Sequence, residues 1–181
     1  MLVASNLSVG MAEIAVARKP ILYTCLGLGS CVAVCALDTK TGVSGVIHVM
    51  LPETFKNRPV EKAGKFADTG VPELVRQMEE AGAIRGKIVV AYSGGASVFQ
   101  FGNGKPGFQD VGTRNGAAVE KAVESLGLPV IATDVGGTNG RSLFMCSESG
   151  EVRVRTVRHG EFTLCNLRGK EAHVKVRGDN A

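Results

Sequence analysis

Two uncharged apolar runs joined by a short polar turn constrain the fold of this chain more than any other feature. Residues 32–37 are apolar and rich in valine and alanine, and residues 43–51 continue in the same way until Pro52 stops them. Residues 38–42 between them have turn chemistry and end in a glycine placed to adopt a positive φ. The pattern predicts a buried β-hairpin.

The remaining segments alternate between strand and helix patterns. Apolar residues recur at helical spacing in 60–81, and again in a second helix that Thr113 or Asn115 caps and Gly127 ends. Short apolar or alternating runs predict further strands at 9–17, 21–25, 87–92, 129–134, 142–146 and 151–157. The sequence therefore predicts a single-domain α/β fold, a layered sandwich of a mixed β-sheet and two main helices.

The last segment differs in character from the rest. Residues 159–181 are polar and basic, with Leu164 and Leu167 as their obvious apolar anchors. We therefore expect one domain over residues 1–158 and a peripheral basic tail over 159–181.

Composition excludes several classes of function. The net charge is only +4, the basic residues are scattered and aromatic residues make up 5%, so nucleic-acid binding is not indicated. The five cysteines form no C-x-x-C pair and have no histidine at metal spacing, so no metal site is expected. The uncharged run 20–37 is interrupted by glycines and is too short to span a membrane, and we expect no secretory leader because residues 1–20 lack its pattern. A cytoplasmic protein without membrane insertion is expected.

Cys31 and His48 are the candidate reactive pair. If Asp38 faces Val43 across the turn, Ala33 faces His48, and Cys31 is a diagonal neighbour of His48 on the same face of the hairpin. A register tighter by two residues would place the pair directly opposite, whereas an odd shift would separate them. A thiol beside an imidazole is the smallest nucleophile–base unit. On spacing alone, a small core cysteine and a buried histidine are the simpler interpretation.

The segment before the thiol reads L-G-L-G-S-C. It is no dinucleotide-binding loop, because it leads into a strand rather than a helix and lacks a third glycine. Gly29 and Ser30 instead leave backbone N–H groups free to bind an oxyanion beside the thiol. We expect a histidine neighbour to lower the pKa of a catalytic Cys31. For Arg114, Asn115 and Arg141, solvation or helix capping is the expected role, with lining of the site as the alternative.

Several motifs resemble the CheD family, the chemoreceptor glutamine deamidases of bacterial chemotaxis. They are L-G-L-G-S-C-V-A-V with H-V-M-L-P, then F-A-D-T-G-V-P-E-L, S-G-G-A, G-x-R-N and D-V-G-G-T-N-G-R, in the family's order over residues 9–157. The resemblance implies the CheD fold and hydrolysis of protein glutamine side chains to glutamate through a thioester on Cys31, with His48 as base and no cofactor. It also implies chemoreceptor cytoplasmic domains as substrates and a CheC-type phosphatase as a partner.

One family position departs from the pattern. The third catalytic member of the family is a threonine before the glycine turn, and here Cys25 stands in its place, with Thr24 one residue earlier. Three alternatives follow for the group that orients His48: the Cys25 thiol, Thr24 returned to the site by a bulge, or a backbone carbonyl. The departure keeps a rival function open, a non-catalytic chemotaxis regulatory module that acts through a CheC-type partner.

Overall fold

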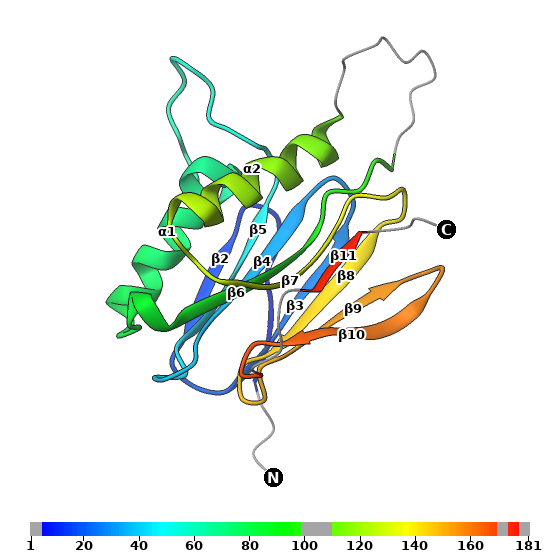
Figure 1. Ribbon diagram of the computed structural model, residues 1–181. Coiled ribbons are helices and arrows are strands. Elements are labelled where there is room, and N and C mark those ends of the chain that lie inside the picture. Colours follow the sequence, from blue (N-terminus) through cyan, green and yellow to red (C-terminus); the bar gives the residue numbers. More distant parts are fainter. Residues whose placement is uncertain (1–4, 99–109, 170–173, 178–181) are drawn as a thin grey trace.

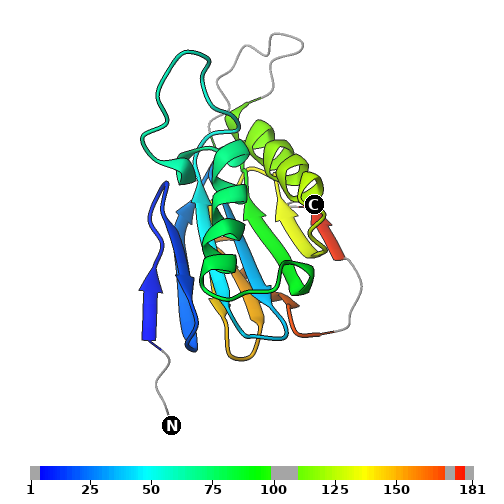
Figure 2. The same ribbon diagram turned by 90° about the vertical axis from the view of Figure 1, so that its left-hand side faces the viewer.

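The computed structural model describes residues 5–98, 110–169 and 174–177, and it has three layers. A five-stranded sheet packs against one face of a six-stranded sheet, and the helices α1 (Ala67–Glu80) and α2 (Val111–Ser125) cover the other face (Figures 1 and 2). The predicted layered α/β sandwich is confirmed, with its strands divided between two sheets. No helix in the described part of the chain combines the length and the apolar character that crossing a membrane requires.

The two sheets are both mixed. In the five-stranded sheet β1 runs parallel to β3 and the other pairs are antiparallel, whereas in the six-stranded sheet β7 runs parallel to both β6 and β11. In spatial order the five strands are β1 (Ser5–Ser8), β3 (Ile21–Leu28), β8 (Arg141–Cys146), β9 (Glu151–Thr156) and β10 (Gly160–Asn166). The six are β11 (Val174–Arg177), β7 (Val130–Val135), β6 (Ile88–Gly94), β4 (Val32–Asp38), β5 (Ser44–Val49) and β2 (Ile14–Ala17). Two short 3₁₀ turns, η1 (Ala63–Lys65) and η2 (Arg85–Lys87), precede α1 and β6.

The predicted hairpin is formed by β4 and β5 at the centre of the six-stranded sheet. The Asp38 N–H donates to the Val43 carbonyl at 2.8 Å, and Ala33 pairs with His48. Gly42 has a φ of +80°, as the turn requires. The Asp38 carboxylate accepts from the turn and also from the Ile84 N–H at 2.6 Å, which ties the hairpin to the chain that enters β6.

The alternation along β4 divides the core in two. Side chains such as Val32 and Val34 pack under the helices, and Ala33 and Cys35 face the five-stranded sheet. Both faces of β4 are buried along its whole length, which explains its unbroken apolar sequence. The odd-numbered residues of β4 therefore face the layer between the two sheets.

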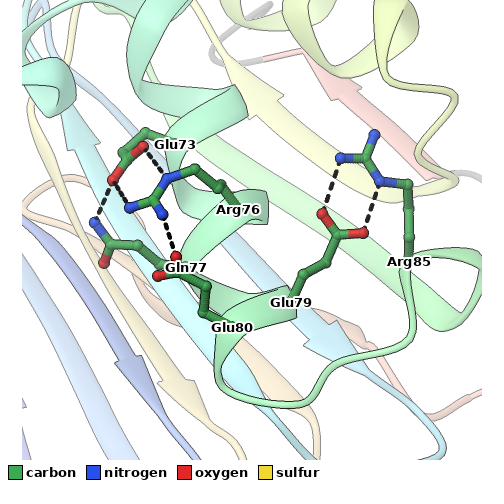
Figure 3. A network of polar contacts seen from close by, with 6 residues as sticks. All are labelled: Glu73, Arg76, Gln77, Glu79, Glu80 and Arg85. Atoms are coloured by element: carbon green, nitrogen blue, oxygen red, sulfur yellow. Dashed lines mark hydrogen bonds and ion pairs between the residues drawn. The ribbon is translucent and has the colours of Figure 1, made fainter.

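The helices present apolar stripes to the sheet and charged residues to solvent. Figure 3 shows the exposed end of α1, where Arg76 binds Glu73 at 2.7 Å and also Glu80, and where Arg85 binds Glu79 at 3.0 Å. Exposed pairs of this kind stabilise a helix only slightly. The helices begin elsewhere than expected: α1 begins after η1 rather than at residue 60, and the Asp110 carboxylate caps α2 by accepting from the Thr113 N–H.

The segment after residue 158 is part of both sheets, which corrects the expectation of a peripheral tail. β10 pairs with β9 along its length, and β11 extends the six-stranded sheet beside β7. Leu164 and Leu167 are 6% and 1% exposed, so these two anchors close one side of the layer between the sheets. β10 carries no basic residue, and its exposed positions include the polar Glu161 and Thr163, so the composition of the segment did not reveal the strand.

The glycine pair after β6 lies against the backbone of the candidate nucleophile. Gly94 and Gly95 have φ angles of +130° and +65°, and a Cβ on Gly94 would lie 2.1 Å from the Cys31 carbonyl oxygen. Gly136 and Gly137 follow the neighbouring strand β7 in the same left-handed region. Thus β6 and β7 both end in a Gly-Gly pair at the same edge of the sheet, and the pair after β6 requires glycine for close approach as well as for its turn.

We predict that Gly94→Ala destabilises the fold by about 2 kcal/mol or more, because it combines a strained φ with a backbone clash. Gly116→Ala is the matched control: Gly116 is helical and its Cβ would make an ordinary 3.8 Å contact with Val135. This change should stabilise the protein by about 0.5–1 kcal/mol. Urea unfolding of both variants measures the difference, and equal stabilities would contradict the prediction.

Candidate active site

The register of the hairpin brings Cys31 and His48 to the same face. Ala33 pairs directly with His48, so Cys31, two residues before Ala33, is a diagonal neighbour of the histidine. Such neighbours lie about 7–8 Å apart, within reach of a long side chain. Both face the layer between the sheets: Cys31 packs against that core and is partly exposed, and His48 is 3% exposed. A partly exposed thiol and a buried imidazole thus lie on the same face of the hairpin.

A backbone carbonyl fixes the orientation of the imidazole. His48 Nδ1 lies 3.1 Å from the Val9 carbonyl oxygen, and because a carbonyl only accepts, Nδ1 carries the proton in this hydrogen bond. Nε2 is buried and has no hydrogen-bond partner among the described residues. The imidazole therefore holds an unshared electron pair on Nε2 in a fixed direction, which is the form that a general base needs.

Val9 is held in turn by the five-stranded sheet. Its N–H donates to the Thr24 carbonyl at 2.8 Å, directly after the parallel pairing of β1 with β3. The chain then crosses to the other sheet. There the Ala12 N–H donates to the His48 carbonyl, and the His48 N–H donates to the backbone carbonyl of Glu13. The segment from Val9 to Glu13 therefore fixes both the backbone and the ring of the histidine.

Burial raises the pKa of the Cys31 thiol and lowers the pKa of His48, although the Val9 hydrogen bond and the charge of Glu13 oppose the second shift. Both groups are therefore neutral at pH 7 in the free protein, and the expected lowering of the Cys31 pKa is wrong. Cys146 has the lowered pKa instead: burial acts to raise it, but hydrogen bonds from Ser149 outweigh that effect. Alkylation rate by itself consequently does not identify the nucleophile.

Cys25 and Thr24 point to opposite sides of the five-stranded sheet. Cys25 pairs with the fully buried Leu143 and belongs to the core between the sheets, on the side of His48. Thr24 pairs with Phe144, whose ring lies under the guanidinium groups of two arginines on β9. The strand does contain a bulge, but it falls after Cys25, at the left-handed Gly27, and so does not turn Thr24 toward the site.

A buried polar network lies on the same face of the six-stranded sheet. Ser93 pairs with Ala33 on one side and with Asp134 on the other, and its hydroxyl donates to the Asp134 carboxylate at 3.0 Å. Arg141 donates to the same carboxylate at 2.8 Å, and both members of this ion pair are at least 95% buried. Arg141 is buried, which corrects the solvated position expected from the sequence, and its ion pair joins β8 of one sheet to β7 of the other.

The glycine-rich segment is held by backbone hydrogen bonds. The Gly29 carbonyl accepts from the Ala96 N–H and the Cys31 carbonyl accepts from the Gly95 N–H, both at 2.8 Å. These bonds occupy carbonyl groups and leave the N–H groups of Gly29 and Ser30 without an acceptor among the described residues. No cluster of three or more histidine, cysteine or acidic side chains in the described part of the chain could hold a metal ion.

A groove of about 520 Å³ opens beside Met50, at the end of the strand that carries His48. Met11 and Phe55 give it an apolar wall and are 61% and 51% exposed. Arg58, Lys62 and Lys65 supply positive charge along its rim against the single carboxylate of Glu61. The groove is thus an apolar and basic surface that begins at Met50, two residues after His48 in the chain.

Comparison with known proteins identifies the family. The family model described as CheD chemotactic sensory transduction matches residues 50–156. The chain belongs to the CheD family. It is 36% identical over 155 residues to a probable chemoreceptor glutamine deamidase CheD of Clostridium novyi, covering 86% of this chain and 95% of that protein. It is 40% identical over 151 residues to the protein of the same name from Lachnoclostridium phytofermentans, covering 83% and 93%. The CheD resemblance inferred from the motifs is confirmed.

We predict that His48 titrates below its ordinary pKa of about 6.5 and occurs as the Nδ1-protonated tautomer. Because the unfolded chain binds the proton more readily, the contribution of His48 to stability is complete above about pH 6.5 and is lost as the pH falls through the lower folded pKa. A long-range ¹H–¹⁵N spectrum followed from pH 8 to pH 4 measures both properties. A protonated Nε2 at pH 7.5 would contradict this assignment.

Proposed function

We propose that this chain deamidates glutamine side chains of chemoreceptor cytoplasmic domains, with Cys31 as nucleophile and His48 as general base. The names of the CheD relatives support the activity and the substrate class. The observation that supports the residue assignment is the buried, unpartnered Nε2 of His48, held by Val9 on the same hairpin face as the partly exposed thiol. The rival function, a purely regulatory module, is not favoured by the relatives.

In the proposed reaction His48 accepts a proton and gives it up again in each of the two half-reactions. His48 Nε2 takes the thiol proton as Cys31 Sγ attacks the amide carbon of the glutamine, and the N–H groups of Gly29 and Ser30 stabilise the oxyanion. The carbon–nitrogen bond then breaks, and the imidazolium gives its proton to the departing ammonia. Water deprotonated by His48 attacks the thioester, which releases glutamate and restores the thiol. No cofactor enters any of these steps.

The neutral resting state agrees with this sequence of proton transfers. A neutral thiol and a buried neutral imidazole carry no separated charges until the substrate arrives, so proton transfer accompanies the attack. When the substrate covers the partly exposed face, it excludes water from the developing charges and strengthens their attraction. The apolar and basic groove beside Met50 supports docking of the protein segment that carries the glutamine.

We predict that Cys31→Ala abolishes conversion of receptor glutamine to glutamate, and that His48→Ala lowers it by roughly 10²–10⁴-fold. The measurement is peptide mass spectrometry of a purified receptor cytoplasmic domain after incubation, with ammonia release as a second readout. Cys146→Ala is the matched control and should retain full activity. Conversion by the Cys31→Ala variant at the normal rate would exclude the proposed nucleophile, and no conversion by the native chain would exclude the function.

The third catalytic position is tested by a separate series. Because the Val9 carbonyl already orients His48, we propose the backbone alternative and expect Cys25→Val and Thr24→Val each to keep turnover within about twofold. If the Cys25 thiol is the orienting group, Cys25→Val should lower turnover roughly five- to thirtyfold, the effect of losing about 1–2 kcal/mol, and Cys25→Thr should preserve or raise it. A damaging Thr24→Val would instead indicate a shifted strand.

A further inference from the structure

The side chain of Asn115 connects the strand of the thiol to the strand of the imidazole. Its Nδ2 donates to the Ser30 carbonyl at 2.7 Å and to the Met50 carbonyl at 2.8 Å. Ser30 immediately precedes Cys31, and Met50 lies two residues after His48. Both carbonyls are at the open end of the hairpin, beyond the last paired residues Val32 and Val49. One amide group therefore closes the hairpin where its backbone ladder stops.

At the position of Asn115, an apolar side chain would lose less free energy on burial. It lies on the buried stripe of α2 with Val119 and Val123, and it is fully buried. Its Oδ1 has no hydrogen-bond partner among the described residues. A buried acceptor without a partner lowers the stability of the fold. The two hydrogen bonds that Nδ2 donates are therefore present in spite of that loss of stability. Asp110 caps the helix, which removes capping as an explanation for this asparagine.

The hydrogen bond to Ser30 also fixes the direction of the next N–H. In a trans peptide the carbonyl and the following N–H point to opposite sides, so the Cys31 N–H points away from Asn115. The Cys31 N–H has no acceptor among the described residues, and the Cys31 carbonyl is held by Gly95. The peptide that carries the nucleophile is thus clamped at both ends, with one donor left available beside Sγ.

We propose that Asn115 is a positioning residue: its amide clamps the Ser30–Cys31 peptide to the end of the His48 strand and aims the Cys31 N–H at the oxyanion. As a role in deamidation, this inference rests on the proposed function. The effect that it predicts, faster acylation of the Cys31 thiol, does not require glutamine as the substrate. Asn115 does not touch the reacting atoms and acts only through these two carbonyls.

The test compares two reactions of the same thiol in the full-length chain. p-Nitrophenyl acetate acetylates Cys31 through an oxyanion and releases p-nitrophenolate, whereas iodoacetamide alkylates it by direct displacement, without an oxyanion. In Asn115→Asp, a nearly isosteric change that replaces the donor by an acceptor, the acetylation rate should fall roughly 10–100-fold. The alkylation rate of Cys31, followed by peptide mass spectrometry, should change by less than about threefold.

Receptor turnover should follow acetylation, with kcat lowered and KM nearly unchanged. Asn115→Ala, which keeps the helix propensity high, serves if the aspartate variant does not fold. Asn6→Asp makes the same chemical change on an exposed strand residue and should leave all rates as in the native chain. Thermal unfolding of each variant verifies that the fold persists.

Each outcome decides the inference. Unchanged acetylation in a folded Asn115 variant overturns it, and so does an equal fall in both reactions, which would show a structural role only. Failure of the native Cys31 to acetylate would also overturn it. If the native chain acetylates at Cys31 but converts no receptor glutamine, the proposed function fails, and the ratio of the two rates still decides the role of Asn115.

Discussion

The pairing register of β4 on β5 is the constraint on which the candidate site depends. A strand presents alternate residues to opposite faces, so a shift of one residue would turn His48 under the helices and leave Cys31 without a base. The observed register is fixed by the Asp38 turn and by complete burial of β4, because both of its faces must match a core. The chemistry of the site therefore follows from the packing of an apolar hairpin.

The groups that hold Cys31 and His48 in place come from every layer of the fold. The Val9 carbonyl comes from the edge of the five-stranded sheet, and the Asn115 amide comes from α2. Gly94 allows the backbone after β6 to approach Cys31. Each contact uses a main-chain atom or a fully buried side chain, so its geometry is set by the fold rather than by flexible surface groups.

The hairpin, the two helices and the shared face of Cys31 and His48 could be predicted from the sequence because their signals are local: turn residues, periodicity and motif spacing. The Val9 carbonyl could be foreseen only as one of three alternatives, since every residue type carries a carbonyl. A strand in 160–166 was missed because its exposed positions are mostly polar, because an irregularity between Thr163 and Cys165 breaks the alternation, and because its pairing partner β9 sets its place. Asn115 did give a signal, a polar residue in register with Val119 and Val123, and the capping interpretation obscured it.

The distribution of these contacts along the chain bears on how activity emerges during folding. Cys31 and His48 are joined by one tight turn, so they meet through a short loop closure that the chain can complete early. The Val9 and Asn115 contacts require closure of the sheets and docking of α2 onto the hairpin. A partly folded chain can thus bring thiol and imidazole together without fixing the tautomer or the nucleophile's peptide. Under the proposed function, completion of the tertiary structure is then the step that makes Cys31 reactive.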